Sequence, residues 1–94
     1  MANKLFELGR LVITPAAKAA LDANGVREIL IALHERHAVG DWGEISDNDK
    51  EANDEAVKHG GDMILSAYVI NSIRFWIITE HDRSVTTVLL PEDY

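Results

Sequence analysis

The sequence predicts a single α+β domain, in which a short N-terminal strand and two or three helices pack on a C-terminal three-stranded antiparallel meander. Its 94 residues are enough for one domain and too few for two, so residues 1–94 are expected to form one unit. Apolar residues recur at helical spacing as far as about residue 59, and the remaining segments alternate as strands do.

The first elements are a short strand and a short helix. Residues 8–13 are apolar and β-branched, which is typical of a strand. Thr14 and Pro15 provide the N-cap and the first position of a helix over the alanine-rich stretch that follows. We expect this helix to cover residues 16–23 and to end at Gly25, where a glycine just past the last turn would stop it.

A second helix is expected over residues 26–38, closed by Gly40. Its apolar stripe consists of Val26, Ile29, Leu30, Leu33 and His37. An irregular link with glycine on both sides of an Asp-Trp pair follows the helix.

The third helix is expected over residues 47–59 and ends at Gly60-Gly61. Ser46 and Asp49 resemble a capping box at its start. The carboxylates in and before this helix are Glu44, Asp47, Asp49, Glu51, Asp54 and Glu55. They form either a solvated face or a binding surface for a basic partner.

Three strands complete the chain, over residues 63–70, 73–79 and 84–90. The turns between them are short, so consecutive strands must be antiparallel neighbours. We expect one face of the meander to carry the helices. The other face either meets solvent through Tyr68 and Trp76 or is covered by a partner.

The composition excludes several classes of function. With no cysteine, the chain forms no disulfide, thiolate nucleophile or Cys-ligated metal site. The net charge of −7 disfavours a nucleic-acid partner, which would need Lys and Arg at its phosphates, and favours a basic protein partner. The sequence shows neither a signal-peptide core nor an apolar run near the roughly 18 residues that span a bilayer, so we expect a cytoplasmic protein without a membrane partner.

The first candidate site comprises His34, His37, Asp41 and Trp42. Histidines three apart project from one side of a helix, and Asp41 could orient either ring, which would give a general acid/base pair. The alternative is a partly buried His37 beside a solvated His34. Trp42 is either an anchor for its loop or an exposed indole that holds a partner. The patterns of zinc proteases and calcium loops are absent, and we predict neither a metal nor a cofactor.

The second candidate site follows the turn at residues 80–83. Arg83 at a strand mouth could hold a phosphate or carboxylate, and a threonine hydroxyl could complete the site. Because Thr86 and Thr87 point to opposite faces, at most one of them shares the pocket of Arg83. Alternatively, threonine simply suits a strand and Arg83 pairs with an acidic residue of the turn, Glu80 or Asp82.

Two stretches resemble short proteins carried by bacterial plasmids, phages and other mobile elements. They are Arg36-His-Ala-Val-Gly-Asp-Trp-Gly43 and Trp76-Ile-Ile-Thr-Glu-His-Asp-Arg-Ser-Val-Thr-Thr-Val-Leu-Leu-Pro-Glu-Asp-Tyr94. Residues 49–53 and 65–68 also fit, so the resemblance covers nearly the whole chain from Leu8. That family carries no established activity, and the resemblance implies only a mobile-element accessory protein.

The order of elements, helices first and an antiparallel sheet afterwards, also resembles the barnase/RelE-like ribonucleases. This resemblance implies His37 as the acid/base group, Arg83 as the phosphate clamp, and Thr86 or Thr87 as a hydroxyl contact. Such an enzyme needs these side chains in one shared pocket. The net charge of −7 departs from that family.

We therefore expect a non-enzymatic module that binds a macromolecular partner through the Trp42 loop, the acidic helix, or both. A small ribonuclease-like enzyme is the alternative. Homodimerisation through an exposed sheet face is a third interpretation.

Overall fold

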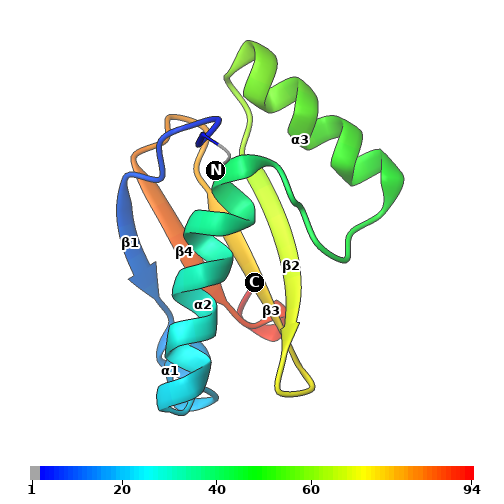
Figure 1. The fold of residues 1–94 in the computed structure, drawn as a ribbon. Coiled ribbons are helices and arrows are strands. Elements are labelled where there is room, and N and C mark those ends of the chain that lie inside the picture. The colour runs from blue at the N-terminus through cyan, green and yellow to red at the C-terminus, as the bar shows by residue number, and fades with distance from the viewer. Residues whose placement is uncertain (1–2) are drawn as a thin grey trace.

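The computed structural model describes residues 3–94 and places helices on one face of a four-stranded mixed sheet, as Figure 1 shows. The strands are β1 (Arg10–Ile13), β2 (Ile64–Ile70), β3 (Ile73–Thr79) and β4 (Val85–Leu89), and the α-helices are α1 (Pro15–Ala19), α2 (Ala23–Glu35) and α3 (Asp47–His59). Two short 3-10 helices, η1 (His37–Val39) and η2 (Pro91–Asp93), complete the secondary structure. The predicted α+β class is confirmed.

The sheet has the strand order β1-β4-β3-β2. Strands β2, β3 and β4 form the antiparallel meander that the sequence predicts. Strand β1 pairs with β4 in parallel, from Arg10 opposite Val85 to Ile13 opposite Val88. The two edges of the sheet are therefore β1 and β2, and α2 crosses between them on one face (Figure 1).

The turns of the meander have the expected chemistry. Asn71 and Ser72 both have positive φ, of 53° and 66°, which is the backbone of a type I′ hairpin turn. At the next turn, the carboxylate of Asp82 accepts hydrogen bonds from the backbone N–H and the hydroxyl of Ser84. Arg83 itself has a φ of 62°, and its side chain is held by the contacts described below.

The boundary between the first two helices differs from the prediction. Helix α1 has five residues and ends at Ala19, and α2 begins at Ala23. The carboxylate of Asp22 accepts a hydrogen bond from Gly25 N–H at 2.7 Å, so Asp22 is the N-cap of α2. Gly25 therefore lies in the first turn of α2, and the expectation that it ends the first helix was wrong.

The predicted apolar stripe of α2 was wrong in part. The buried face consists of Gly25, Ile29, Ala32 and Leu33. Val26 and Leu30 are 44% and 48% exposed. Helix α2 also ends at Glu35, and His37 belongs to η1, where the chain turns towards the sheet before Gly40 ends this segment in a left-handed conformation.

The core lies between α2 and the sheet. Its largest members are Tyr68, Phe75 and Ile77 from the sheet and Ile29 and Leu33 from α2. A second cluster joins Trp42 and Ile64 to Ala56, the buried apolar residue of α3. Helix α3 has the predicted bounds and the predicted Ser46 cap, and it lies beyond the β2 edge of the sheet (Figure 1).

The second face of the meander carries Trp76 but not Tyr68. The two residues stand on adjacent pairs of the β2–β3 ladder, Tyr68 opposite Phe75 and Ala67 opposite Trp76, so their side chains point to opposite faces. Tyr68 is buried under α2, and Trp76 packs against Tyr94 with ring centroids 5.7 Å apart. The expectation that Tyr68 shares a solvent face with Trp76 was wrong.

Candidate functional site

His37 lies in a buried chain of hydrogen bonds at the centre of the domain. Its Nδ1 is 2.5 Å from the hydroxyl of Ser66, and its Nε2 is 2.9 Å from the hydroxyl of Thr79. Thr79 is 2.7 Å from Thr86, whose hydroxyl donates to the Leu8 carbonyl. The four side chains from His37 to Thr86 are completely buried. These hydrogen bonds join η1 to three strands and to the segment before β1.

The direction of these bonds fixes the tautomer of His37. Thr86 gives its only proton to the Leu8 carbonyl, so it must accept the proton of Thr79. Thr79 must then accept a proton from Nε2 of His37. In a neutral imidazole, Nδ1 then carries no proton and accepts from Ser66. His37 is a neutral ring with hydrogen on Nε2.

Burial keeps His37 in this neutral form. Removal of the ring from water penalises the charged imidazolium and lowers the pKa of His37 from 6.5 to about 3. Among residues 3–94, no carboxylate hydrogen-bonds to the ring, because both nitrogens are bonded to hydroxyls. His37 is therefore buried as a neutral, hydrogen-bonded side chain and does not lie at the mouth of a cleft.

The guanidinium of Arg83 donates hydrogen bonds to main-chain carbonyls. Its guanidinium donates to the carbonyls of Asp62 at 2.6 Å, Glu80 at 3.1 Å and His81 at 3.3 Å. A fourth bond, of 2.9 Å, reaches the Ala56 carbonyl near the end of α3. Arg83 thus ties the β3–β4 turn to the C-terminal turn of α3, and no carboxylate of the described residues pairs with it.

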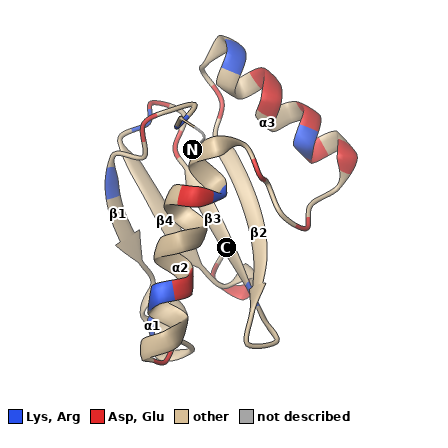
Figure 2. Ribbon diagram, viewed as in Figure 1, with Lys and Arg blue, Asp and Glu red and all other residues tan. Residues whose placement is uncertain are grey.

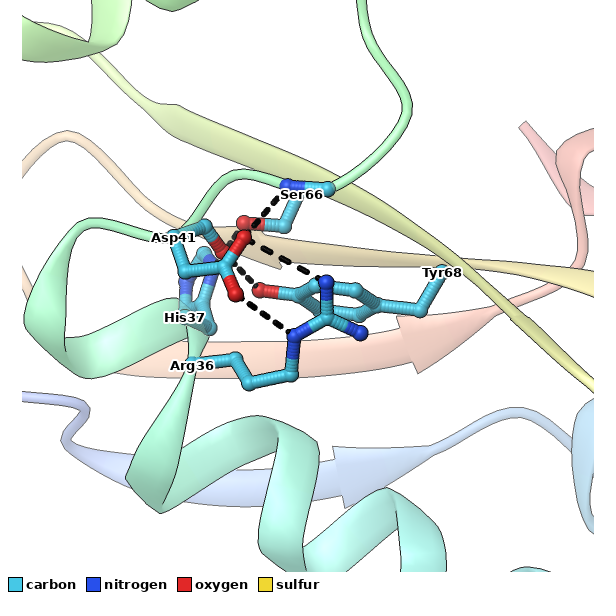
Figure 3. Close-up of polar contacts among 6 residues, drawn as sticks. Arg36, His37, Asp41, Ser66 and Tyr68 are labelled. Atoms are coloured by element: carbon cyan, nitrogen blue, oxygen red, sulfur yellow. Dashed lines mark hydrogen bonds and ion pairs between the residues drawn. The ribbon is translucent and has the colours of Figure 1, made fainter.

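Asp41 of the first candidate site forms a separate polar cluster with Arg36 and Tyr68, drawn in Figure 3. Asp41 forms an ion pair with Arg36 at 2.7 Å, which raises the pKa of Arg36 and lowers that of Asp41. The guanidinium of Arg36 lies 4.4 Å from the centre of the Tyr68 ring. The Tyr68 hydroxyl donates to the Asp41 carbonyl, and burial raises its pKa to about 12. Asp41 orients neither histidine, and His34 is exposed on α2.

Trp42 is an anchor for its loop. Its side chain is 4% exposed and packs near Phe6 and His37. The indole N–H donates to the carboxylate of Asp54 on α3 at 2.9 Å, so the residue also holds that helix against the loop. A buried indole with its donor satisfied offers no surface to a partner.

The structure brings together only part of the residues named from the sequence. His37 and Thr86 share one hydrogen-bond chain, which is closed to solvent. Arg83 is bonded to carbonyls elsewhere, and Thr87 points to the helix-free face because it is the neighbour of Thr86 in β4. His37, Arg83 and a threonine therefore do not line one accessible pocket.

An exposed apolar surface that the sequence did not reveal lies between α2 and β1. Leu11 and Ile13 of β1 are 42% and 37% exposed and line one groove with Val26 and Leu30 of α2. We call these four residues the α2–β1 surface. Helix α2 is thus apolar on more than its buried side, which is typical of a helix that another protein covers. The sequence contains the apolar residues of this surface, but their helical spacing predicts one inward stripe.

The two edges of the sheet differ in how their outward main-chain groups are hydrogen-bonded. At the β2 edge, the amide of Asn53 exchanges two hydrogen bonds with the N–H and C=O of Leu65. Ala67 bonds in the same way to the loop, to the Trp42 carbonyl and the Glu44 N–H. The Asn53 side chain and the Trp42 loop therefore replace a neighbouring strand along Leu65 and Ala67 and protect this part of the edge.

The β1 edge has no such protection. The N–H of Arg10 donates to the Ser84 carbonyl just before β4, and the N–H of Thr14 donates to the Val88 carbonyl in β4. By the alternation of a strand backbone, Leu11 and Ile13 direct their N–H and C=O groups away from β4. Within residues 3–94, no side chain or loop hydrogen-bonds to these groups. The α2–β1 surface thus ends at an open strand edge.

The acidic helix lies at the far side of the molecule from β1, and Figure 2 shows its charges. All five of its carboxylate residues are exposed. Glu55 forms an ion pair with His59, and Asp54 accepts from Trp42. Among the described residues, neither Lys50 nor Lys58 lies within salt-bridge distance of a carboxylate.

Fold and site together define a small α+β domain with a closed polar interior and one open, apolar sheet edge. Comparison with known proteins adds no relative: no family model, no curated protein and no solved structure matches the chain. The resemblance to mobile-element proteins and to barnase/RelE-like ribonucleases stays a prediction. Within residues 3–94, no helix is long and apolar enough to cross a membrane, and no cluster of residues could hold a metal ion.

Proposed function

We propose that this protein is a non-enzymatic interaction module that binds a protein partner through the α2–β1 surface. The observation that carries the proposal is the exposure of Leu11, Ile13, Val26 and Leu30 in one groove beside an unprotected strand edge. Exposed apolar side chains gathered in one patch mark protein-binding surfaces more often than scattered ones do.

The hydrogen bonding of His37 and Arg83 favours a binding function over a catalytic one. His37 has both nitrogens bonded and no access to solvent, and Arg83 donates to four carbonyls. A ribonuclease would need these groups free at a common site, to move a proton and to stabilise charge at a phosphate. The ribonuclease alternative therefore has no observation that favours it.

The charge of the chain favours a basic protein as a further partner, bound at the acidic helix α3 and not at the α2–β1 surface. A net charge of −7 attracts positively charged proteins over several ångströms and repels nucleic acid. We place such a partner in the cytoplasm, where a protein without cysteines needs no oxidising compartment for its stability. An accessory role for a mobile element is consistent with this proposal and rests on the sequence resemblance alone.

Site-specific photo-cross-linking tests the proposed surface. A photoreactive phenylalanine analogue replaces Leu30 on the α2–β1 surface, and a matched variant carries it at Asn48, which is exposed on α3. Irradiation in a host lysate is expected to give a discrete adduct from position 30 and none of the same mass from position 48. Adducts absent from position 30, both to other proteins and to the chain itself, would contradict the proposal.

A further inference from the structure

We infer that the partner seated on the α2–β1 surface is a second copy of this chain, joined through antiparallel pairing of the two β1 strands. The inference rests on the proposed function and names its partner. It joins two four-stranded sheets into one sheet of eight strands. The β2 edge is less suited to this, because Asn53 and the Trp42 loop cover the outward groups of Leu65 and Ala67, two of the three residues of β2 that face outwards.

The backbone of β1 is complementary to itself. Leu11 and Ile13 both direct N–H and C=O groups outwards, and Val12 lies between them. A two-fold axis at Val12 sets Leu11 opposite Ile13 of the second copy, and the reverse on the other side of the axis. Each of these two pairs exchanges both of its N–H···O=C bonds, as opposed residues of an antiparallel ladder do. The pairing satisfies every outward group of the two residues.

The side chains make the same contact apolar. Leu11 lies opposite the buried Thr86 in the ladder, and Ile13 lies opposite Val88, so both point to the face that carries α2. There they meet Val26 and Leu30 in the groove. Pairing of the edges brings the two grooves together across the axis. A strand of four residues makes few ladder bonds, so burial of this apolar seam is needed to hold the dimer.

Charged residues lie at both ends of the α2–β1 surface. Lys18 in α1 and Arg27 in the first half of α2 lie at the end where β1 finishes. Glu7 and Glu35 lie at the opposite end, before β1 and at the end of α2, because α2 runs opposite to β1 (Figure 1). An antiparallel copy sets Lys18 and Arg27 of one chain near Glu35 of the other. Glu7 forms an ion pair with Lys4 of its own chain at 2.7 Å, and Arg10 begins β1 at the same end.

The overall acidity of the chain does not prevent this assembly. Helix α3 lies beyond the β2 edge, at the side of the sheet farthest from β1 (Figure 2). With strands about 4.8 Å apart, an eight-stranded sheet keeps the two α3 helices more than about 30 Å from each other. That separation exceeds the Debye length of about 8 Å at physiological salt, so their mutual repulsion is screened.

Sedimentation equilibrium of the purified chain tests the dimer. We expect a reversible monomer–dimer equilibrium in the micromolar range, since the contact lies at the small end of stable interfaces. Leu11→Lys places two charges at the seam and is expected to weaken dimerisation at least about tenfold. Val69→Lys is the matched control, because Val69 is 48% exposed on the other edge strand, and it is expected to leave the equilibrium unchanged.

A second variant separates loss of dimerisation from misfolding of β1. Leu30→Glu alters α2 alone and is expected to weaken the dimer as Leu11→Lys does, with the circular dichroism of the wild type retained. A wild-type chain that stays monomeric up to about 1 mM would overturn the inference. So would a dimer that Leu11→Lys and Leu30→Glu leave intact.

The two proposals fail in different ways. A monomeric chain that still cross-links to another protein from position 30 overturns the second copy and leaves the proposed function standing. A monomeric chain that cross-links to nothing from position 30 overturns both. A self-adduct from position 30, lost in the Leu11→Lys background, supports both.

Discussion

A neutral imidazole is stable at the centre of this domain because each of its nitrogens has one hydroxyl partner. Ser66 donates to Nδ1 of His37, Thr79 accepts from Nε2, and the chain ends at a main-chain carbonyl beyond Thr86. Protonation would add a donor at Nδ1 and a charge in a dry site. The buried network therefore makes stability depend on pH.

The stability of the protein should fall as the pH drops below about 6.5. The pKa of His37 is about 3 in the folded chain and near 6.5 when the chain unfolds. Below pH 6.5 the unfolded chain binds a proton that the folded chain does not, so acid favours unfolding until the folded group titrates near pH 3. Urea unfolding between pH 7 and pH 5 should show a decrease approaching about 1.4 kcal/mol per pH unit.

The variant His37→Gln separates this effect from that of other groups. Asp41 and Asp82 have lowered pKa values, so the stability they contribute is lost only as pH falls through and below 3.8. Between pH 7 and pH 5 the slope should therefore flatten in the variant, whatever its absolute stability. Equal slopes in the two proteins would show that His37 is not buried as a neutral group.

The sequence could single out these residues but not their contacts. The sequence indicates His37 as a candidate residue and leaves its burial as one of two interpretations. Its partners Ser66 and Thr79 lie 29 and 42 residues away along the chain, and nothing in a β-branched or small strand residue signals a hydrogen bond across such a separation. Arg83 likewise gave no sign that it would meet carbonyls of α3.

Among the elements, regular spacing and clear caps decided which predictions were confirmed. Helix α3 and strands β2 and β3 have the predicted bounds to within one residue, because Ser46, the two glycines and tight turns mark their ends. The face of α2 was not decided, since its apolar residues occupy more than one side. Which side is buried depends on how the helix crosses the sheet, which spacing alone does not specify.

Loss of the Asn53 amide should open the β2 edge. Asn53→Ala leaves the N–H and C=O of Leu65 without partners at a site where the Asn53 side chain is 4% exposed. Two unpaired main-chain groups should lower the free energy of unfolding by about 2 kcal/mol. Chemical denaturation measures this loss, and hydrogen exchange at the Leu65 amide should accelerate. Asn48→Ala, on an exposed position of the same helix, should change neither; similar effects from both would contradict the role assigned to Asn53.

At the scale of the whole molecule, the arrangement of strands and charges separates two regions of the surface. The acidic helix lies beyond one edge of the sheet (Figure 2). The apolar groove lies at the other edge. The sequence predicted an N-terminal strand but not its place, because the parallel pairing of β1 with β4 joins segments about 75 residues apart. The open edge could therefore be found only in the structure.

Charge reversal at the two ends of the α2–β1 surface should test the orientation of the dimer. The double variant Lys18→Glu/Arg27→Glu makes both ends acidic, and Glu7→Lys/Glu35→Lys makes both ends basic. Each alone should dimerise more weakly than the wild type, because like charges meet across the two-fold axis. A mixture of the two variants should form heterodimers, since every acidic end then meets a basic one.

Native mass spectrometry of the mixture distinguishes homodimers from heterodimers once the two chains differ in mass. Heterodimers should exceed the statistical proportion at low salt, and the excess should shrink as salt screens the exposed charges.

A parallel arrangement of the two strands predicts a different result: it would set each end against the same end of the second copy. Mixing would then again bring acidic ends to basic ones, but the wild type itself would be weakened by like charges and strengthened by salt. A wild-type dimer that weakens with salt therefore supports the antiparallel pairing, and one that tightens contradicts it.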